Sequence, residues 1–304
     1  MFKYTLDNKR YHTFNYFLKN KFNSKVFKIP LDNHATCPNK KNGGCIYCKD
    51  NSKSNITDEK LTLLEQYEKE VVILNKKWPN AKHIAYFQTG TNTNMPLDEF
   101  KKSIEPFLNI SEIIGISIAT RSDCLNEEYL DYFESLSKKT FLTIELGLQS
   151  SNNNTLRLIN RGHDKENFAK AVKSLKERNI FTVAHIINGL PFETKEDMLE
   201  TARFLNELKI DGIKIHMLHV LKDTPLEKLY NKNNFHILSK EEYIDIVISQ
   251  LEILDEKIVI ERITGDPIIE DLITPTWLTK KFILLNDIDK EMVKRNTYQG
   301  IKKV

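Results

Sequence analysis

The chain has 304 residues, with 45 Lys and Arg against 42 Asp and Glu, which gives a formal net charge of +3. A chain of this length can bury a core without disulfides or metals, and so small a charge excess permits nucleic-acid binding without arguing for it. Three of its four cysteines are crowded between residues 37 and 48, unlike a secreted disulfide framework. We find neither a signal peptide nor an apolar run long enough for a membrane, so we expect a cytoplasmic protein with reduced thiols.

Short β-rich runs alternate with longer helical patterns along the chain. The predicted strands are 25–30, 83–88, 113–119, 141–148, 181–189, 212–220 and 257–263. The predicted helices are 58–77, 96–108, 126–137, 164–178, 194–208, 240–255 and 276–294. This alternation is typical of βαβ units, and the continuously apolar strands favour a parallel sheet covered by helices. Neither of the two common nucleotide-phosphate loops, G-x-G-x-x-G after the first strand and G-x-x-x-x-G-K-[ST], occurs.

Two helices have recognisable start signals. Thr57 opens the first predicted helix, and Thr194 with Asp197 resembles a capping box ahead of the helix at 194–208. Polar residues also follow six consecutive predicted strands. They lie in the segments 34–50, 88–94, 120–124, 145–150, 188–191 and 218–225. Because the loops after the strands of a parallel barrel meet at one mouth, the sequence predicts a barrel-like domain with a single active site there.

The stretch HATCPNKKNGGCIYCKD, residues 34–50, contains Cys37, Cys45 and Cys48, with His34 three positions before the first cysteine. Three thiolates and an imidazole could bind zinc. Three thiolates alone could instead hold an iron–sulfur cluster with one iron left open, and the glycines at 43 and 44 would let the backbone wrap around it. Thiolates suit both metals, so the stretch by itself leaves the choice open.

The cysteine loop, placed just after the first strand of a βα repeat, resembles the cluster loop of radical SAM enzymes. Most of that superfamily has fewer residues between the first two cysteines than the seven between Cys37 and Cys45. A longer spacing is typical of the elongator-protein-3-like branch and of the YhcC/YtqA-type proteins. The resemblance to the latter runs nearly end to end. It is carried by RYHTFNYFL, YFQTGTNTNMPLDE, TRSDCL, ELGLQSSNNNTLRLINRGHD, VAHIINGLPFET, GIKIHMLHVLKDTPL and ERITGD.

Two departures from this family pattern stand out. The loop between Cys37 and Cys45 is shorter than the family leads us to expect, which should alter the shape of the loop and not the ligation. Gly90 stands where an aromatic residue such as Tyr is expected. We expect this glycine to open the pocket near the cofactor.

The resemblance implies an α/β fold with a partial (βα)6 TIM-type barrel. This radical SAM core would cover 25–225, after an N-terminal extension at 1–24 and before a C-terminal α/β extension at 226–304 that packs on the same domain. It also implies that Cys37, Cys45 and Cys48 carry a [4Fe–4S] cluster whose open iron is chelated by S-adenosylmethionine (SAM). One electron, from a donor such as flavodoxin or ferredoxin, would cleave a C–S bond of SAM. The resulting 5′-deoxyadenosyl radical would abstract hydrogen from the substrate.

Further cofactor contacts follow from the resemblance, and each has a simpler structural explanation. The predicted residues are Tyr47, Gln88, Thr89, Asn92, Arg121, Glu145, Arg157 and Asn188. Tyr47 would pack by the adenine, or merely within its loop. Gln88, Thr89 and Asn92 would bind the SAM amino group, or only form a turn. Asn188, at the end of the fifth strand, would touch adenosine, or only end that strand in a turn.

The charged candidates also have alternatives. Arg121 would pair with the SAM carboxylate or with Asp123 beside it. Glu145, between apolar residues, needs a partner when buried: a ribose hydroxyl, the SAM amino group, or an arginine such as Arg157 or Arg161. Cys124, in the third βα loop, is either a catalytic thiol that contacts or donates hydrogen to the substrate, or an inert buried side chain.

For the substrate we rely on the resemblance alone. It implies a tRNA-modifying enzyme that converts 5-carboxymethylaminomethyl-uridine at the wobble position to 5-aminomethyl-uridine. A set of C-terminal cations could help to hold RNA phosphates or could be a solvated face. They are Lys280, Lys281, Lys290, Lys294, Arg295, Lys302 and Lys303. The alternatives are a radical SAM enzyme that acts on a small metabolite or peptide, and a binding module stabilised by zinc on His34 and the three cysteines.

Overall fold

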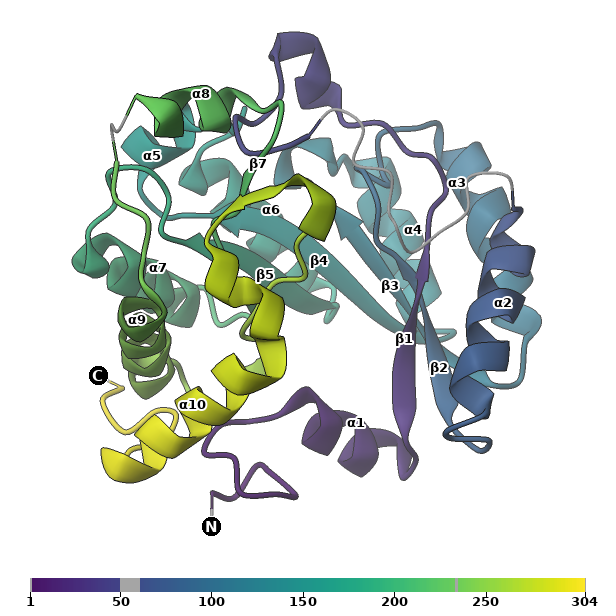
Figure 1. The fold of residues 1–304 in the computed structure, drawn as a ribbon. Helices are drawn as coiled ribbons and strands as arrows, with labels where there is room; N and C mark the ends of the chain where they lie inside the picture. The colour runs from purple at the N-terminus through teal and green to yellow at the C-terminus, as the bar shows by residue number, and fades with distance from the viewer. Residues whose placement is uncertain (1, 50–60, 233–234, 304) are drawn as a thin grey trace.

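The computed structural model describes residues 2–49, 61–232 and 235–303. Its centre is a sheet of seven parallel strands in the order β1-β2-β3-β4-β5-β6-β8, curled into an incomplete barrel (Figure 1). The strands are β1 (Val26–Leu31), β2 (Lys82–Phe87), β3 (Ile113–Thr120), β4 (Phe141–Gln149), β5 (Phe181–Asn188), β6 (Gly212–Met217) and β8 (Val259–Arg262). The predicted α/β barrel-type fold is confirmed, with seven strands in the sheet where the family resemblance implied six.

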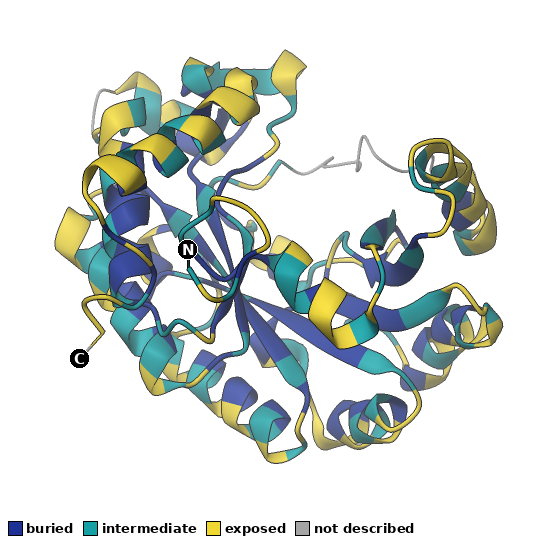
Figure 2. Cartoon of the chain, turned by 90° about the horizontal axis from the view of Figure 1, so that it is seen from below, coloured by how far each residue is buried: buried dark blue, intermediate teal, exposed yellow. Residues whose placement is uncertain are grey.

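Helices cover the outside of the sheet. They include α2 (Leu63–Asn75), α3 (Leu97–Ile104), α4 (Glu127–Ser137), α6 (Lys165–Glu177), α7 (Lys195–Glu207), α9 (Lys240–Ile253) and α10 (Lys281–Lys294). Figure 2 shows the strands buried at the centre and the outer faces of the helices exposed. No helix within the described ranges is long and apolar enough to span a bilayer.

Helix starts follow side-chain capping. Thr194 and Asp197 form the predicted capping box of α7. In α2, Thr62 and Glu65 form another one; the start predicted at Thr57 lies outside the described residues. Three shorter helices were not predicted, because six to nine residues show too little periodicity. They are α1 (Phe14–Phe22), α5 (Asn153–Leu158) and α8 (Pro225–Asn231).

The two ends of the chain both join the barrel. Residues 13 and 260 form a parallel bridge that brings α1 beside β8. The ring of Phe17 lies 5.0 Å from that of Phe181 and 6.1 Å from that of Phe141, at the starts of β5 and β4. Helix α1 therefore covers the end of the barrel opposite the strand carboxyl ends (Figure 1). Near the carboxyl ends, β7 (Val220–Leu221) and β9 (Leu272–Thr274) form a small antiparallel ribbon.

Candidate functional site

A cavity of about 400 Å³ lies at the carboxyl ends of the strands. Cys37, Cys45 and Cys48 all line it, and so do five of the other predicted site residues. Those five are Tyr47, Gln88, Thr89, Arg121 and Glu145. The size falls within the range of roughly 300–1,000 Å³ that is usual for small-molecule sites. Segments far apart in the sequence thus meet at one mouth, where the polar βα junctions were predicted to converge.

The cysteine loop is held against α5 by hydrogen bonds. The buried amide of Asn39 donates to the carbonyl of Asn160 at 2.7 Å and lies 3.6 Å from the Cys45 sulfur. Asn160 donates in turn to the carbonyl of Gly44 at 2.7 Å. Gly43 and Gly44 have φ of +86° and +69°, a backbone conformation that glycine adopts without strain. These contacts place all three sulfurs on the wall of the cavity.

Gly90 allows a close approach between two loops at the cavity wall. It has φ +73°, and a Cβ atom there would lie 1.8 Å from the carbonyl oxygen of Ala35. An aromatic residue at this position would therefore push the loop after β2 away from the cysteine loop. Gly90 thus lets the loop after β2 lie close to the cysteine loop. From the sequence we had expected that this glycine would instead widen the pocket. Asn92 helps to hold the turn, because its amide donates to the carbonyls of Phe87 at 3.0 Å and Ala119 at 2.7 Å.

Arg121 is buried and forms two 2.8 Å hydrogen bonds with Asp123, through Nε and Nη2. Of the two partners that the sequence suggested for Arg121, the structure therefore shows Asp123. The Nη1 of Arg121 also lies 4.0 Å from the Cys37 sulfur. Cys124 follows in the same turn and does not line the cavity. Burial raises the pKa of its thiol to about 11, so the thiol stays protonated at neutral pH.

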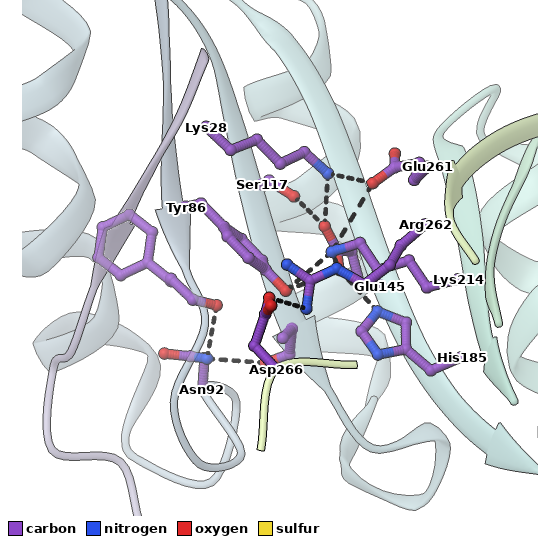
Figure 3. A network of polar contacts seen from close by, with 12 residues as sticks. Lys28, Tyr86, Asn92, Ser117, Glu145, His185, Lys214, Glu261, Arg262 and Asp266 are labelled. Atoms are coloured by element: carbon purple, nitrogen blue, oxygen red, sulfur yellow. Dashed lines mark hydrogen bonds and ion pairs between the residues drawn. The ribbon is translucent and has the colours of Figure 1, made fainter. Parts of the chain in front are cut away.

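Glu145 is the centre of a buried polar layer at the floor of the cavity (Figure 3). Its Oε1 accepts from Lys28 at 2.6 Å, and its Oε2 accepts from Lys214 at 2.5 Å. Glu261 balances the second positive charge, 2.6 Å from Lys28 and 3.7 Å from Lys214. The other donors to Glu145 are Ser117 at 2.7 Å, Tyr86 at 2.8 Å and His185 at 2.6 Å. Neither of the two arginines suggested by the sequence is a partner.

This layer takes one side chain from each strand of the seven-stranded sheet. In strand order they are Lys28, Tyr86, Ser117, Glu145, His185, Lys214 and Glu261. Burial by itself would raise the pKa of Glu145, but the charges of Lys214 and Lys28 outweigh it and hold that pKa well below its ordinary value. Burial lowers the pKa of His185, so a neutral ring donates its Nε2–H to Glu145.

Besides Asn92, two predicted cofactor residues lie away from the cavity. Arg157 is exposed on α5, where its guanidinium contacts the side chain of Asn154. Asn188 is buried against α9 and exchanges two hydrogen bonds with Gln250, of 2.8 and 2.9 Å. Like Asn92, it holds a strand end in place and does not line the cavity.

Gln149 and Arg161 are among the residues that line the cavity but were not predicted from the sequence as cofactor contacts. Arg161 is only 5% exposed and donates to the carbonyl of Gly147 at 2.6 Å. Its Nε has no hydrogen-bond partner, and no carboxylate of a described residue forms an ion pair with it. A buried guanidinium whose Nε lacks an acceptor is costly and suits an anionic ligand. The sequence offered one signal for Arg161 as a site residue. It lies in the string INRGH, which is separated from the end of β4 only by the short helix α5.

Glu193 joins the loops after β4 and β5, because it accepts a hydrogen bond from Ser150. Burial raises the pKa of Glu193 to about 7, so it keeps its proton in the folded protein below that pH. The unfolded chain ionises near the ordinary value of 4.5. The stability contributed by the protonated group is therefore complete below pH 4.5 and is lost as the pH rises to 7.

We expect Glu193→Gln to remove this loss, which amounts to about 3 kcal/mol for a pKa raised from 4.5 to about 7. The free energy of unfolding, measured by denaturant titration from pH 4.5 to 8, should then vary less than in the wild type. Glu207, exposed on the outside of α7, offers the control. Glu207→Gln should keep the wild-type profile, and an unchanged profile in Glu193→Gln would contradict the shifted pKa.

The sequence also matches two family models. The Radical SAM superfamily model covers residues 36–205, and the Radical_SAM C-terminal domain model covers 210–294. The first alone spans more than half of the chain and contains all of the cavity-lining cysteines. The chain therefore belongs to the radical SAM superfamily, as the resemblance indicated.

Individual relatives agree with this assignment. YtqA of Bacillus subtilis is 41% identical, with 98% of this chain and 94% of YtqA covered. YhcC of Escherichia coli is 25% identical, with 90% and 89% covered. A tRNA uridine(34) acetyltransferase of Methanocaldococcus infernus is 27% identical over 54% of this chain and 32% of that protein.

Among solved structures, the archaeal Methanocaldococcus infernus Elp3 with an N-terminal deletion matches with a TM-score of 0.70. The two sequences are 19% identical over 91% of this chain, which spans 64% of that one. At this identity the likeness concerns the fold, and it agrees with the partial barrel described above.

Proposed function

We propose that the protein holds a [4Fe–4S] cluster on Cys37, Cys45 and Cys48 and binds SAM in the same cavity. The observation that carries this proposal is that the three cysteines and Arg161 line one cavity at the mouth of the barrel, and that the Nε of Arg161 has no hydrogen-bond partner among the described residues. Soft thiolates are the usual ligands of such a cluster, and a guanidinium is the usual partner of a carboxylate.

The residues present fit a cluster with an open iron better than a closed zinc site. Three cysteines line the cavity, and His34, the fourth ligand that zinc would use, does not. The His34 side chain is 53% exposed, and its Nδ1 lies 3.8 Å from a carboxylate oxygen of Asp32. Four protein ligands are usual for structural zinc, whereas a cluster on three thiolates keeps one position for a small molecule.

The surrounding side chains would place and enclose the cofactor. Arg161 would bind the SAM carboxylate, since Arg121 is already paired with Asp123. Gln88 and Thr89 would receive the amino group, and Tyr47 would pack by the adenine. When bound, the cluster supplies the electron that cleaves a C–S bond of SAM, so that hydrogen can be abstracted from a substrate.

The substrate that we propose is the wobble uridine of tRNA, converted from the 5-carboxymethylaminomethyl to the 5-aminomethyl form. The support is the near end-to-end resemblance to YhcC/YtqA-type proteins. It is strengthened by the relative from Methanocaldococcus infernus that is a tRNA uridine(34) acetyltransferase, although that relative matches only part of this chain.

This substrate can be tested by nucleoside analysis of tRNA from a strain that lacks the protein. We expect 5-carboxymethylaminomethyl-uridine to accumulate and the 5-aminomethyl form to disappear, as measured by liquid chromatography and mass spectrometry. Complementation with the wild-type gene should restore the pattern, and complementation with the Cys45→Ala variant should not. Unchanged wobble nucleosides would contradict the tRNA substrate and leave the superfamily assignment standing.

A further inference from the structure

Three cations near the mouth of the barrel have no carboxylate partner among the described residues. We call Lys41, Arg157 and Lys222 the basic rim. Lys41 is exposed in the turn after Cys37. Arg157 contacts only the amide oxygen of Asn154, and the Lys222 ammonium donates to the backbone carbonyl of Glu270 at 2.8 Å. Neutral oxygens of this kind leave the positive charge uncompensated.

The three segments that carry the basic rim touch one another. The Asn160 side chain, just after α5, donates to the carbonyl of Asn42 beside Lys41 at 2.8 Å. On the other side of the cysteine loop, the amide of Leu226 in α8 donates to the carbonyl of Ile46 at 2.9 Å. Helices α5 and α8 and strand β7 lie at the same end of the barrel (Figure 1). The rim charges therefore surround the loop that carries the cluster ligands.

An exposed aromatic ring lies at the same end. Phe192 follows β5, is 61% exposed and has φ +67°, a strained conformation for a bulky residue. Its ring lies 6.5 Å from that of Phe235, which is 6.3 Å from the ring of Tyr230 in α8. A residue held in a strained conformation with its ring in solvent calls for a functional explanation.

The C-terminal cations suggested by the sequence are mostly compensated instead. Five of the seven form ion pairs: Lys281 with Asp266, Lys294 with Glu291, Arg295 with Asp245, Lys302 with Glu252 and Lys303 with Asp255. RNA phosphates would have to compete with these carboxylates. The basic rim needs no such exchange, because its charges have no carboxylate partner.

We propose that the basic rim and Phe192 form the surface on which RNA docks. The cations contact the phosphates, and Phe192 stacks on an unpaired base, so that a nucleotide of a single-stranded loop is presented to the cavity. Phosphate contacts supply most of the affinity, and base–aromatic stacking is the usual way to hold single-stranded RNA. This inference rests on the proposed function, because it takes tRNA as the substrate.

The test measures binding of a tRNA transcript with uridine at the wobble position, at salt concentrations from 50 to 200 mM. The rim variant carries Lys41→Gln, Arg157→Gln and Lys222→Gln. The matched control removes the same charge from the C-terminal set through Lys280→Gln, Lys290→Gln and Lys294→Gln. We expect the rim variant to bind at least tenfold more weakly at 50 mM salt. The slope of log K against log salt concentration should also be smaller in magnitude by about 2 to 3. Each of the three lost phosphate contacts accounts for roughly 0.7–0.9 of that slope.

The aromatic contact has its own outcome. Phe192→Ala should lower the affinity at every salt concentration without a change of slope, because stacking releases no counterions. All the substituted side chains of the rim are exposed, so the thermal unfolding of each variant should match that of the wild type. That measurement separates a lost contact from a lost fold.

Several outcomes would overturn the proposal. A rim variant with wild-type affinity and slope, or a control variant that loses as much, would place the RNA elsewhere. A wild-type protein that binds no tRNA at 50 mM salt would contradict this inference and the tRNA substrate together. If instead wobble nucleosides change in the deletion strain while the rim variant binds normally, only the docking surface is wrong.

Discussion

Replacement of Cys45 by alanine is expected to abolish SAM cleavage while the protein stays folded. The proposed cluster loses one of its three ligands. Apart from Cys37 and Cys48, which are already proposed as ligands, the described part of the cysteine loop contributes no cysteine or histidine to the cavity wall that could replace Cys45. The fold should survive, because the barrel core is formed by the strands and the covering helices. The loop also keeps the hydrogen bonds from Asn39 to the carbonyl of Asn160 and from Asn160 to the carbonyl of Gly44, although the contact of Asn39 with the Cys45 sulfur is lost.

Metal and sulfide analysis after anaerobic reconstitution measures the first part of this prediction. The wild type should hold about four iron atoms with acid-labile sulfide, and the variant should hold far less. Cys124→Ala is the matched control, because Cys124 lies outside the cavity wall, and its iron content should equal that of the wild type. One zinc ion without sulfide in the wild type, or global unfolding of the Cys45 variant, would instead favour a structural zinc site.

Replacement of Glu145 by glutamine is expected to destabilise the fold by about 3–5 kcal/mol, the usual cost of breaking a buried ion pair. In the variant, Lys28 and Lys214 would face only Glu261, and a neutral amide would leave one buried cation without compensation. The free energy of unfolding, measured by denaturant titration at neutral pH, reports the loss.

A double variant separates the charge effect from a packing effect. Glu145→Gln combined with Lys214→Met restores the charge balance of the layer, so it should recover part of the lost stability. A double variant that loses the sum of the two single effects would show that the charges do not interact. A single variant within 1 kcal/mol of the wild type, a margin below the usual cost, would contradict the central role of Glu145.

The same layer predicts how stability depends on acid. Because the pKa of Glu145 is lowered in the folded protein, its contribution is present above the ordinary value of 4.5 and is lost as the pH falls through the folded pKa. The stability gap between the wild type and Glu145→Gln should therefore be constant from pH 5 to 8. It should narrow only in stronger acid.

Local sequence features were enough to predict the order of the elements. Strands and helices differ in their apolar periodicity, and capping pairs such as Thr194 and Asp197 lie three positions apart, so the information is contained in short windows. The same holds for the cysteine loop, whose three cysteines lie within twelve positions. Because the strands are parallel, their polar carboxyl ends had to meet at one mouth.

Only the tertiary structure decided which polar residues face the cavity. Arg157 and Arg161 stand four positions apart, yet the first is exposed on α5 and the second is buried in the cavity wall. Asn92 and Asn188 looked like ligands because they end strands, but their amides hold neighbouring segments in place. A strand end or short helix leaves several directions open to a side chain, and the packing of the neighbouring elements selects one.

The sequence by itself thus determined the superfamily and the barrel, and it predicted the three cysteines as ligands, because these depend on local patterns and contiguous motifs. The tertiary structure decided the partners of Glu145. Lys28 is 117 positions away from it and Lys214 is 69 positions away, and nothing in either neighbourhood indicates the other. The charges meet because closing a curled parallel sheet brings one inward side chain from each strand into a single layer. In that buried layer, each charge requires a partner of opposite sign.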